Sequence, residues 1–386
     1  VTGPSDSDFG YATAFADFDG NGKDELVVGA PGRVESGIYV FADFDGSQTR
    51  YSDASLTWLS SRTAERAGGA LATGEDWNGD GLPDLVVGIS GQSSTRNHSV
   101  YLFAGSPDGL SELPVATISE TEDFGSFGEW IFAGGDHDGD GLSDFYVSTQ
   151  EDGETRLLVW SGFPASDESI EDADQELYNE GIGTIFLSAD ITGDGLDDRF
   201  VSSDGGLSMD SGPGEGGQFL DVANFGGIIR DEASRLVSYG LASEDLDGDG
   251  YGDLIMTAYQ LNSSETGYQA QALVFNGQPK NLNTSMAAAN SKVELGDGYA
   301  SQLILRDFDD DGTTDLAWND HVDQLRTQLL YSDGLGGYSA EADAVIGEGY
   351  SCAFGMTASS AEPLPWLAIG CSGSEEEVFL FRSAGL

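Results

Sequence analysis

A nine-residue acidic segment near the start of the chain has the residue types of a divalent-cation site. In "DFDGNGKDE", Asp17, Asp19 and Asn21 place side-chain oxygens at positions 1, 3 and 5 of the segment, and Glu25 adds a carboxylate at position 9. Alternate oxygen ligands suit a hard cation with about six to eight oxygen neighbours, and Ca²⁺ fits this pattern better than Mg²⁺.

The residues that follow decide which kind of calcium loop this is. Gly22 holds position 6, where a sharp turn is needed, and Lys23 at position 7 could offer only its backbone carbonyl. An EF-hand needs a glutamate at position 12 and flanking helices. Here position 12 is Val28, inside a short β-branched run that ends before Pro31 and favours a buried strand. The loop is therefore expected to join two strands; for a single copy, a metal-free Asp/Gly hairpin is the alternative.

The same loop occurs six times, beginning at residues 17, 76, 136, 190, 245 and 307, with glycine at position 6 in every copy. We number these copies loops 1 to 6. The side chains at positions 1, 3, 5 and 9 are the predicted ligands, and position 7 could offer only its backbone carbonyl. In chain order the residues at positions 1, 3, 5, 7 and 9 are Asp17, Asp19, Asn21, Lys23, Glu25, Asp76, Asn78, Asp80, Leu82, Asp84, Asp136, Asp138, Asp140, Leu142, Asp144, Asp190, Thr192, Asp194, Leu196, Asp198, Asp245, Asp247, Asp249, Tyr251, Asp253, Asp307, Asp309, Asp311, Thr313 and Asp315. Six copies in phase argue strongly against the metal-free hairpin and predict six Ca²⁺ ions. Thr192 is the weakest ligand of the set, so loop 4 is expected to bind most loosely.

The spacing of the loops predicts the architecture. They recur every 54 to 62 residues, and each repeat places apolar strands around its loop, as at 9–16, 25–30 and 37–42 in the first. A fourth, less regular strand links each unit to the next. Four antiparallel strands per repeat are typical of a propeller blade. We therefore expect an all-β protein, with residues 1–386 forming a single β-propeller domain.

A seventh blade is predicted at the end of the chain. Residues 350–371 align without a gap to 299–320, and 375–383 follow as a third strand. The residues at its five ligand positions do not form a comparable set of ligands: Ala358, Ser360, Glu362, Leu364 and Trp366. The seventh blade is therefore expected to lack metal. The segment from Val1 to Pro4 could supply its fourth strand and close the ring, which would remove exposed sheet edges.

The two cysteines of the chain both fall in this seventh blade. Alignment with loop 1 places Ala358 opposite Trp366, so Cys352 and Cys371 would be one residue from direct opposition on neighbouring strands. Such residues lie within disulfide range. The sequence predicts a disulfide, worth roughly 3 kcal/mol for a loop of about 20 residues; two buried free thiols are the alternative.

The motifs also resemble a known family. Phe9-Gly10 followed by "DFDGNGKDELVVGAP" is similar to the FG-GAP repeat of the seven-bladed propeller in the integrin α head and in bacterial secreted proteins. The resemblance covers nearly the whole chain. It implies calcium at positions 1, 3, 5, 7 and 9 of each loop, on the lower face of the propeller. It also implies partner binding through the loops of the opposite, upper face. The chain differs from integrins in having six intact loops, and nothing in it resembles the leg domains or an inserted adhesion domain.

Composition limits the partners and the setting. The net charge is −53, and six Ca²⁺ would neutralise only 12 of these charges. Repulsion excludes nucleic acid and disfavours anionic membrane surfaces, and such acidity fits a salty or marine habitat. No apolar run is long enough to span a membrane. Because the chain begins at Val1 without a signal peptide, we expect a mature or excised part of a longer protein, monomeric or within a larger surface protein. Loops of this kind need high calcium, which favours an extracellular or cell-surface location.

The sequence shows no catalytic constellation. The three histidines are scattered, and His137 at position 2 of loop 3 is expected to face solvent. The six tryptophans are expected to pack within blades. The leading interpretation is therefore a non-enzymatic, calcium-stabilised binding or adhesion module for a protein or glycan. A sugar-binding lectin, a propeller-type polysaccharide-degrading enzyme and a structural spacer remain alternatives.

The arginines suggest where a partner could bind. Eight of the 12 arginines fall in predicted connections on the upper face, and Arg62 and Arg66 stand together between the first two blades. Arginine binds carboxylates in a bidentate manner, so these two residues are the predicted partner-binding residues. The alternative is that such arginines pair with local acids.

Overall fold

The computed structural model describes most of the chain. The described residues are 1–33, 36–42, 47–61, 65–89, 98–120, 126–151, 154–178, 186–203, 206–211, 219–221, 227–230, 240–261, 268–278, 283–285, 289–297, 300–321, 325–331, 344–346, 356–358, 365–371 and 377–382.

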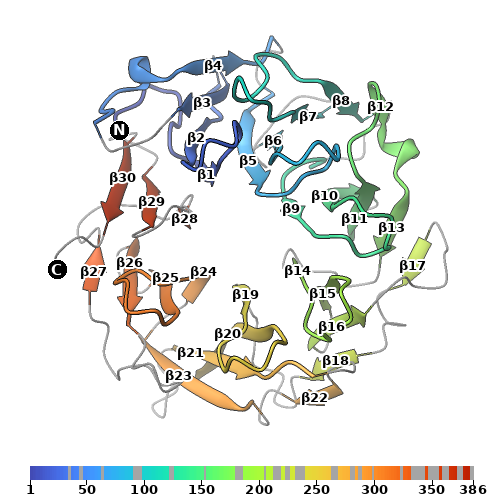
Figure 1. Ribbon diagram of the computed structural model, residues 1–386, viewed down its shortest axis with the longest axis vertical. Helices are drawn as coiled ribbons and strands as arrows, with labels where there is room; N and C mark the ends of the chain where they lie inside the picture. Colours follow the sequence, from blue (N-terminus) through green and yellow to red (C-terminus); the bar gives the residue numbers. More distant parts are fainter. Residues whose placement is uncertain are drawn as a thin grey trace.

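The strands of these residues form seven sheets around a central opening, with the first strand of each sheet nearest the centre (Figure 1). Blade 1 contains β1 (Ala12–Ala16), β2 (Glu25–Ala30), β3 (Gly37–Phe41) and β4 (Leu56–Leu59). Blade 2 contains β5 (Ala67–Thr73), β6 (Leu85–Ile89), β7 (Ser99–Phe103) and β8 (Ala116–Ser119). Blade 3 contains β9 (Ile131–Ala133), β10 (Asp144–Glu151), β11 (Glu154–Ser161) and β13 (Gln175–Tyr178).

The other half of the ring repeats this pattern. Blade 4 contains β14 (Phe186–Ala189), β15 (Asp198–Ser203), β16 (Gly206–Ser211) and β18 (Gly227–Arg230). Blade 5 contains β19 (Leu241–Glu244), β20 (Asp253–Leu261), β21 (Tyr268–Phe275) and β23 (Ser291–Asp297). Blade 6 contains β24 (Ala300–Arg306), β25 (Asp315–His321), β26 (Leu325–Leu330) and β27 (Ala344–Ile346), and blade 7 contains β28 (Met356–Ala358), β29 (Trp366–Cys371) and β30 (Glu377–Arg382). The predicted seven-bladed, all-β propeller is confirmed.

Three blades carry a fifth strand that the sequence did not predict. These strands are β12 (Glu168–Ser169), β17 (Phe219–Asp221) and β22 (Asn283–Ser285). Each pairs in parallel with the outer strand of a blade: β12 with β8, β17 with β13 and β22 with β18. In the described part of the chain the only helical segments are the 3₁₀ turns η1 (Tyr51–Asp53) and η2 (Ile170–Asp172), and none is long and apolar enough to cross a membrane.

The hydrophobic core lies at the seams between blades. The buried apolar residues described by the structure fall into seven clusters, and each draws on two adjacent blades. Trp77 of blade 2, for example, packs against Phe145 of blade 3 with ring centroids 5.8 Å apart. Trp58, Trp160 and Trp318 are also buried, as the sequence predicted. Because every seam contains an apolar cluster, adjacent blades are packed against one another.

The N-terminal segment closes the ring as expected. Thr2 forms an antiparallel bridge with Glu377 of β30, and the Val378 amide donates to the Val1 carbonyl at 2.9 Å. On its other side Thr2 accepts a hydrogen bond from the Tyr51 amide of blade 1 at 2.8 Å. The segment therefore pairs with β30, the outer strand of blade 7 in the described structure, and ties that blade to blade 1.

The register of blade 7 differs from the prediction. Ala358 lies opposite Leu367, one residue after the predicted Trp366. Cys371 ends β29 opposite Glu377, whereas Cys352 lies outside the described residues. The disulfide between them stays a prediction.

Candidate metal-binding loops

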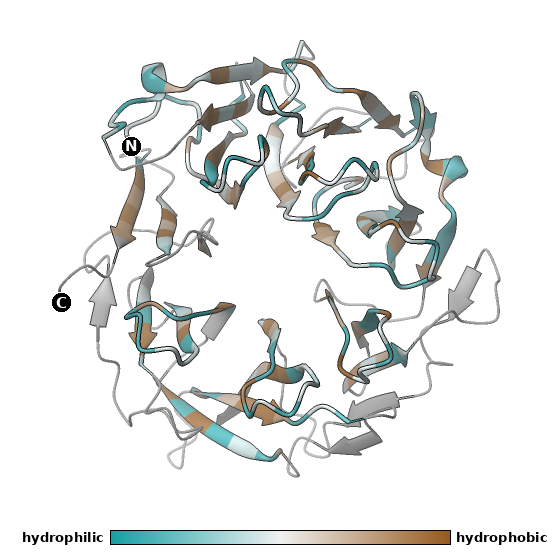
Figure 2. Ribbon diagram, viewed as in Figure 1, coloured by the Kyte–Doolittle hydropathy of each residue, from teal (hydrophilic) through white to brown (hydrophobic). Residues whose placement is uncertain are grey.

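All six acidic loops join the first and second strands of a blade, where the sequence placed them. In blade 1, for example, Ala16 lies opposite Glu25 at the start of the hairpin, so positions 1 and 9 of the loop meet across its base. Figure 2 shows these loops as hydrophilic connections between largely hydrophobic strands. The face that carries them is the lower face.

Each loop folds back onto its own first aspartate. In loop 3, Asp136 Oδ1 accepts hydrogen bonds from the Gly139 and Asp140 amides at 2.6 and 3.1 Å, and Oδ2 accepts one from Gly141 at 2.9 Å. Gly141 has a φ of 92°, which a residue with a side chain rarely adopts. Loops 2, 4 and 5 repeat these three bonds at Asp76, Asp190 and Asp245. The backbone thereby fixes the direction of the position-1 carboxylate.

The carboxylate at position 9 is buried at the base of every loop. One of its oxygens accepts a hydrogen bond from the backbone amide at position 2, with a donor–acceptor distance of 2.7 to 3.2 Å in all six copies. In loop 3 the other oxygen, Asp144 Oδ1, is buried and has no hydrogen-bond donor within the described structure. A buried carboxylate oxygen without a donor is costly unless a cation compensates it.

The carboxylates converge in four of the six loops. Their ligand oxygens lie within 4.8 Å of one another in these groups: Asp17, Asp19 and Glu25; Asp136, Asp138 and Asp140; Asp245, Asp247 and Asp253; and Asp307, Asp309 and Asp311. Loops 2 and 4 carry a neutral residue at position 3. Asn78 donates to Asp84 Oδ1 at 3.0 Å, and the Thr192 hydroxyl donates to Asp198 Oδ1 at 3.3 Å.

Burial and mutual repulsion oppose ionisation of the position-9 carboxylates of loops 2 to 5. Burial raises the pKa of Asp84 and of Asp144 to about 7, and that of Asp198 to about 6. Nearby carboxylates add to this effect, among them Asp138 beside Asp144. Burial also raises the pKa of Asp253. Each loop thus gathers negative charge in a place that water solvates poorly.

The residues present fit a calcium ion. The donors are hard oxygens, several of them charged, arranged around a glycine turn. The buried Asp144 Oδ1 points to a missing positive partner in loop 3. When bound, Ca²⁺ would supply the compensating charge. The residues that would hold it are those at positions 1, 3, 5 and 9, together with the position-7 carbonyl.

His137 is buried, so the prediction that it faces solvent was wrong. Its side chain is only 1% exposed, with Nδ1 lying 2.5 Å from the Asp197 carbonyl of blade 4 and Nε2 3.5 Å from Asp210. Position 2 of every loop enters the seam toward the next blade, and in the other five copies it is apolar: Phe18, Trp77, Ile191, Leu246 and Phe308. That apolar pattern was the signal for burial.

The same seam contains an ion pair that the sequence did not indicate. Arg199 is buried and donates to Asp210 at 2.6 Å and to Gln175 at 2.8 Å. His137 and Arg199 together hold the pKa of Asp210 below its usual value, although burial acts in the opposite direction. The seam between blades 3 and 4 is thus partly ionic. A lone arginine in a strand gives no sequence signal for such pairing.

Of the two predicted partner-binding residues on the upper face, only Arg66 lies within the described residues. Arg66 is 6% exposed and pairs with Asp8 of blade 1 at 3.0 Å, in agreement with the alternative that such arginines pair with local acids. Arg156, another arginine on this face, pairs with Glu151 at 2.5 Å and with Glu176. Arg62 lies outside the described residues.

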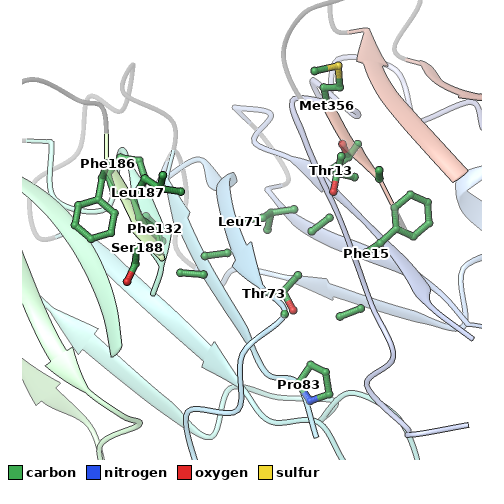
Figure 3. A pocket seen from close by; sticks show the side chains of 18 of the residues that line it. Thr13, Phe15, Leu71, Thr73, Pro83, Phe132, Phe186, Leu187, Ser188 and Met356 are labelled. Carbon is green, nitrogen blue, oxygen red and sulfur yellow. The ribbon is translucent and has the colours of Figure 1, made fainter. Parts of the chain in front are cut away.

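A cavity of about 600 Å³ occupies the central channel (Figure 3). Its described wall mixes apolar side chains and hydroxyls, including Phe15, Leu71, Thr73, Phe132, Phe186 and Ser188. Asp17 and Arg306 are the ionisable residues of that wall. The channel therefore presents mainly apolar and hydroxyl groups.

Comparison with known proteins identifies repeats in the same places. The FG-GAP repeat matches residues 9–42 and 238–275, and the FG-GAP-like repeat matches 76–147. These ranges contain loops 1, 2, 3 and 5.

Curated relatives share a minor part of their length with this chain. Phosphatidylinositol-glycan-specific phospholipase D of Rattus norvegicus is 36% identical over 155 residues, covering 36% of this chain and 18% of the relative. Integrin alpha pat-2 of Caenorhabditis elegans is 27% identical over 170 residues, covering 39% and 14%. Integrin alpha-IIb of Mus musculus is 29% identical over 167 residues, covering 40% and 16%. The matched region thus spans less than a fifth of each of these relatives.

Proposed function

We propose that this chain, an integrin-like propeller of FG-GAP repeats, is a calcium-stabilised extracellular or cell-surface module that binds a protein or glycan partner. The seven sheets, the repeat matches and the integrin relatives support an adhesion-type binding module. The observation that carries the calcium part is the convergence of buried and exposed carboxylates in the repeated loops.

The loops would stabilise the ring through their own residues. Position 1 is fixed by three backbone amides in loops 2 to 5, as in loop 3, and position 9 is held at the base of the hairpin by the position-2 amide. Position 2 also places a side chain in the seam toward the next blade, as Trp77 does when its indole donates to the Asp144 carbonyl at 2.9 Å. A cation that neutralises the carboxylates would therefore hold both the hairpin and the seam.

Partner binding is assigned to the upper face, away from the acidic loops. The propeller would act there as a rigid frame for its connections, because binding residues commonly lie on loops that a stable scaffold positions. No catalytic role is proposed for this chain. The match to a phospholipase D favours, as a second candidate, a non-catalytic propeller within a longer enzyme.

The test uses the purified chain on a glycan array and on immobilised extracellular proteins, in calcium and in EGTA. The proposal expects binding to at least one class of partner in calcium and its loss in EGTA. Thermal melts in the same buffers separate loss of the fold from loss of a contact. A chain that melts at the same temperature in both buffers would contradict the calcium-stabilised part of the proposal.

A further inference from the structure

Neighbouring loops touch through two positions that contribute no side-chain ligand. The position-7 side chain of one loop lies over the position-4 glycine of the loop before it. A methyl group placed on Gly20 of loop 1 would lie 2.8 Å from Leu82 Cδ2 of loop 2. On Gly79 of loop 2 it would lie 3.0 Å from Leu142 Cδ2 of loop 3.

The contact continues along the ring through loop 5. A methyl group on Gly139 would lie 3.5 Å from Leu196 Cδ2 of loop 4, and one on Gly193 would lie 2.4 Å from Tyr251 Cε1 of loop 5. Both glycines have a positive φ, and a side chain on Gly193 would also have to displace Tyr251.

Backbone hydrogen bonds follow the same path in two of these steps. The Asp197 amide, at position 8 of loop 4, donates to the Asp136 carbonyl, at position 1 of loop 3, at 3.1 Å. The Gly252 amide of loop 5 donates to the Asp190 carbonyl of loop 4 at 3.3 Å. Each bond joins a residue next to one position-9 carboxylate to the position-1 residue of the neighbouring loop.

The chain of contacts ends between loops 5 and 6. Nothing lies within 4 Å of a methyl group placed on Gly248 of loop 5, because position 7 of loop 6 is the short Thr313. Loop 6 also has Asp310 rather than glycine at its own position 4, with a φ of 62°.

We propose that Leu82, Leu142, Leu196 and Tyr251 are positioning residues that couple calcium sites 1 to 5, so that these sites bind cooperatively while site 6 binds independently. This inference rests on the proposed calcium binding. Position 7 is an expected ligand through its carbonyl, so a bound ion fixes that residue and its side chain. The fixed side chain then restrains the position-4 glycine of the previous loop, between the ligands at positions 3 and 5. Ordering one loop lowers the entropic cost of ordering its neighbour, which is positive coupling.

The test compares two matched substitutions in the full chain, Gly79→Asn and Gly248→Asn. Both glycines have nearly the same φ, 77° and 76°, and asparagine tolerates that region. At Gly79 the new side chain displaces Leu142, whereas at Gly248 it meets open space. Calcium titrations by calorimetry, with ion counts by native mass spectrometry, should show weaker and less cooperative binding for Gly79→Asn, by about fivefold or more. Gly248→Asn should titrate like the unmodified chain.

A second pair of variants shortens the position-7 side chain and adds no bulk to a glycine. Leu142→Ala removes the contact with Gly79 and should weaken calcium binding at site 2, for which Leu142 provides no ligand. Thr313→Ala is the control and should leave site 5 unchanged, because nothing lies over Gly248. Equal behaviour of both members in each pair, with calcium bound at independent sites, would overturn the coupling and leave the proposed function intact. Absence of calcium binding in the unmodified chain would instead refute the proposed function.

Discussion

Replacing Asp144 by asparagine should stabilise the protein when calcium is absent. The buried carboxylate has a pKa of about 7 rather than 3.8, so its ionised form is unfavourable in the folded protein. A tenfold change in acidity is worth about 1.4 kcal/mol, so at pH 8 the charge destabilises the calcium-free fold by roughly 4 kcal/mol at most. The asparagine side chain keeps an oxygen that can accept the hydrogen bond from the His137 backbone N–H, and it carries no charge. Asp144→Asn should therefore raise the melting temperature in EGTA at pH 8 by a few degrees.

Calcium should progressively reverse that advantage. Binding to the folded form stabilises the unmodified chain by about 1.4 kcal/mol for each tenfold rise in free calcium above the dissociation constant. If the variant has lost site 3, its roughly 4 kcal/mol advantage disappears near a thousandfold excess.

The assay is denaturant unfolding over a series of buffered calcium concentrations. Asp108→Asn, in an exposed turn, removes the same charge and should show no calcium-dependent difference. An Asp144→Asn variant that is less stable than the unmodified chain in EGTA would show that the buried charge does not destabilise the calcium-free fold.

Further predictions concern the pH dependence of stability, the calcium sites, the cysteines and two arginines. In EGTA the stability of the unmodified chain should fall as pH rises from about 4 to 7. Burial raises the pKa values of Asp84, Asp144 and Asp198 to about 7, 7 and 6, so in this pH range the folded chain binds more protons than the unfolded chain. Denaturant unfolding at a series of pH values measures this, and a stability that does not change with pH would count against it. Saturating calcium should raise the melting temperature by about 20 °C, since six sites at about 2.7 kcal/mol each act on a chain of this length, and calorimetry in calcium and EGTA measures it. Loop 4, with Thr192 at position 3, should lose its ion first on dilution into chelator. Asp190→Asn removes a ligand of this loop, so the variant should lack the fastest-released calcium ion of the unmodified chain. Thiol counting under denaturing, non-reducing conditions should find no free thiol if Cys352 and Cys371 form a disulfide, and two free thiols would end that prediction. Arg62→Glu should weaken partner binding without lowering the melting temperature. Arg66→Glu should lower the melting temperature, because it places a carboxylate at a buried position and breaks the ion pair with the partly exposed Asp8.

Much of the fold could be predicted because the repeated loops fix the phase of every blade. Once six loops recur in register, the flanking apolar runs must be the first and second strands, and the structure places them so. The same phase identified blade 7, whose third strand begins at Glu377 within the predicted range. The convergence of Asp17, Asp19 and Glu25 also followed from the spacing alone.

What the sequence did not reveal depends on contacts between blades. The burial of His137 follows from the seam beside it, and a single loop read alone gives no view of that seam. The fifth strands β12, β17 and β22 pair with a different part of the chain through two or three residues each, too few to leave a pattern. Leu142 was expected to act only through its carbonyl. Its side chain contacts Gly79, a whole repeat away in the sequence, and no pattern within its own loop indicates that contact.

The number of calcium ions bound to the folded chain decides whether the six acidic loops are metal sites. Native mass spectrometry of the purified chain, exchanged into a volatile buffer with calcium, counts them without any assumption about the partner. Six loops with oxygen ligands at positions 1, 3, 5 and 9 predict a mass increase of six calcium ions, lost on chelation together with thermal stability. Two or fewer ions per chain, or six that leave the melting temperature unchanged when removed, would contradict the account.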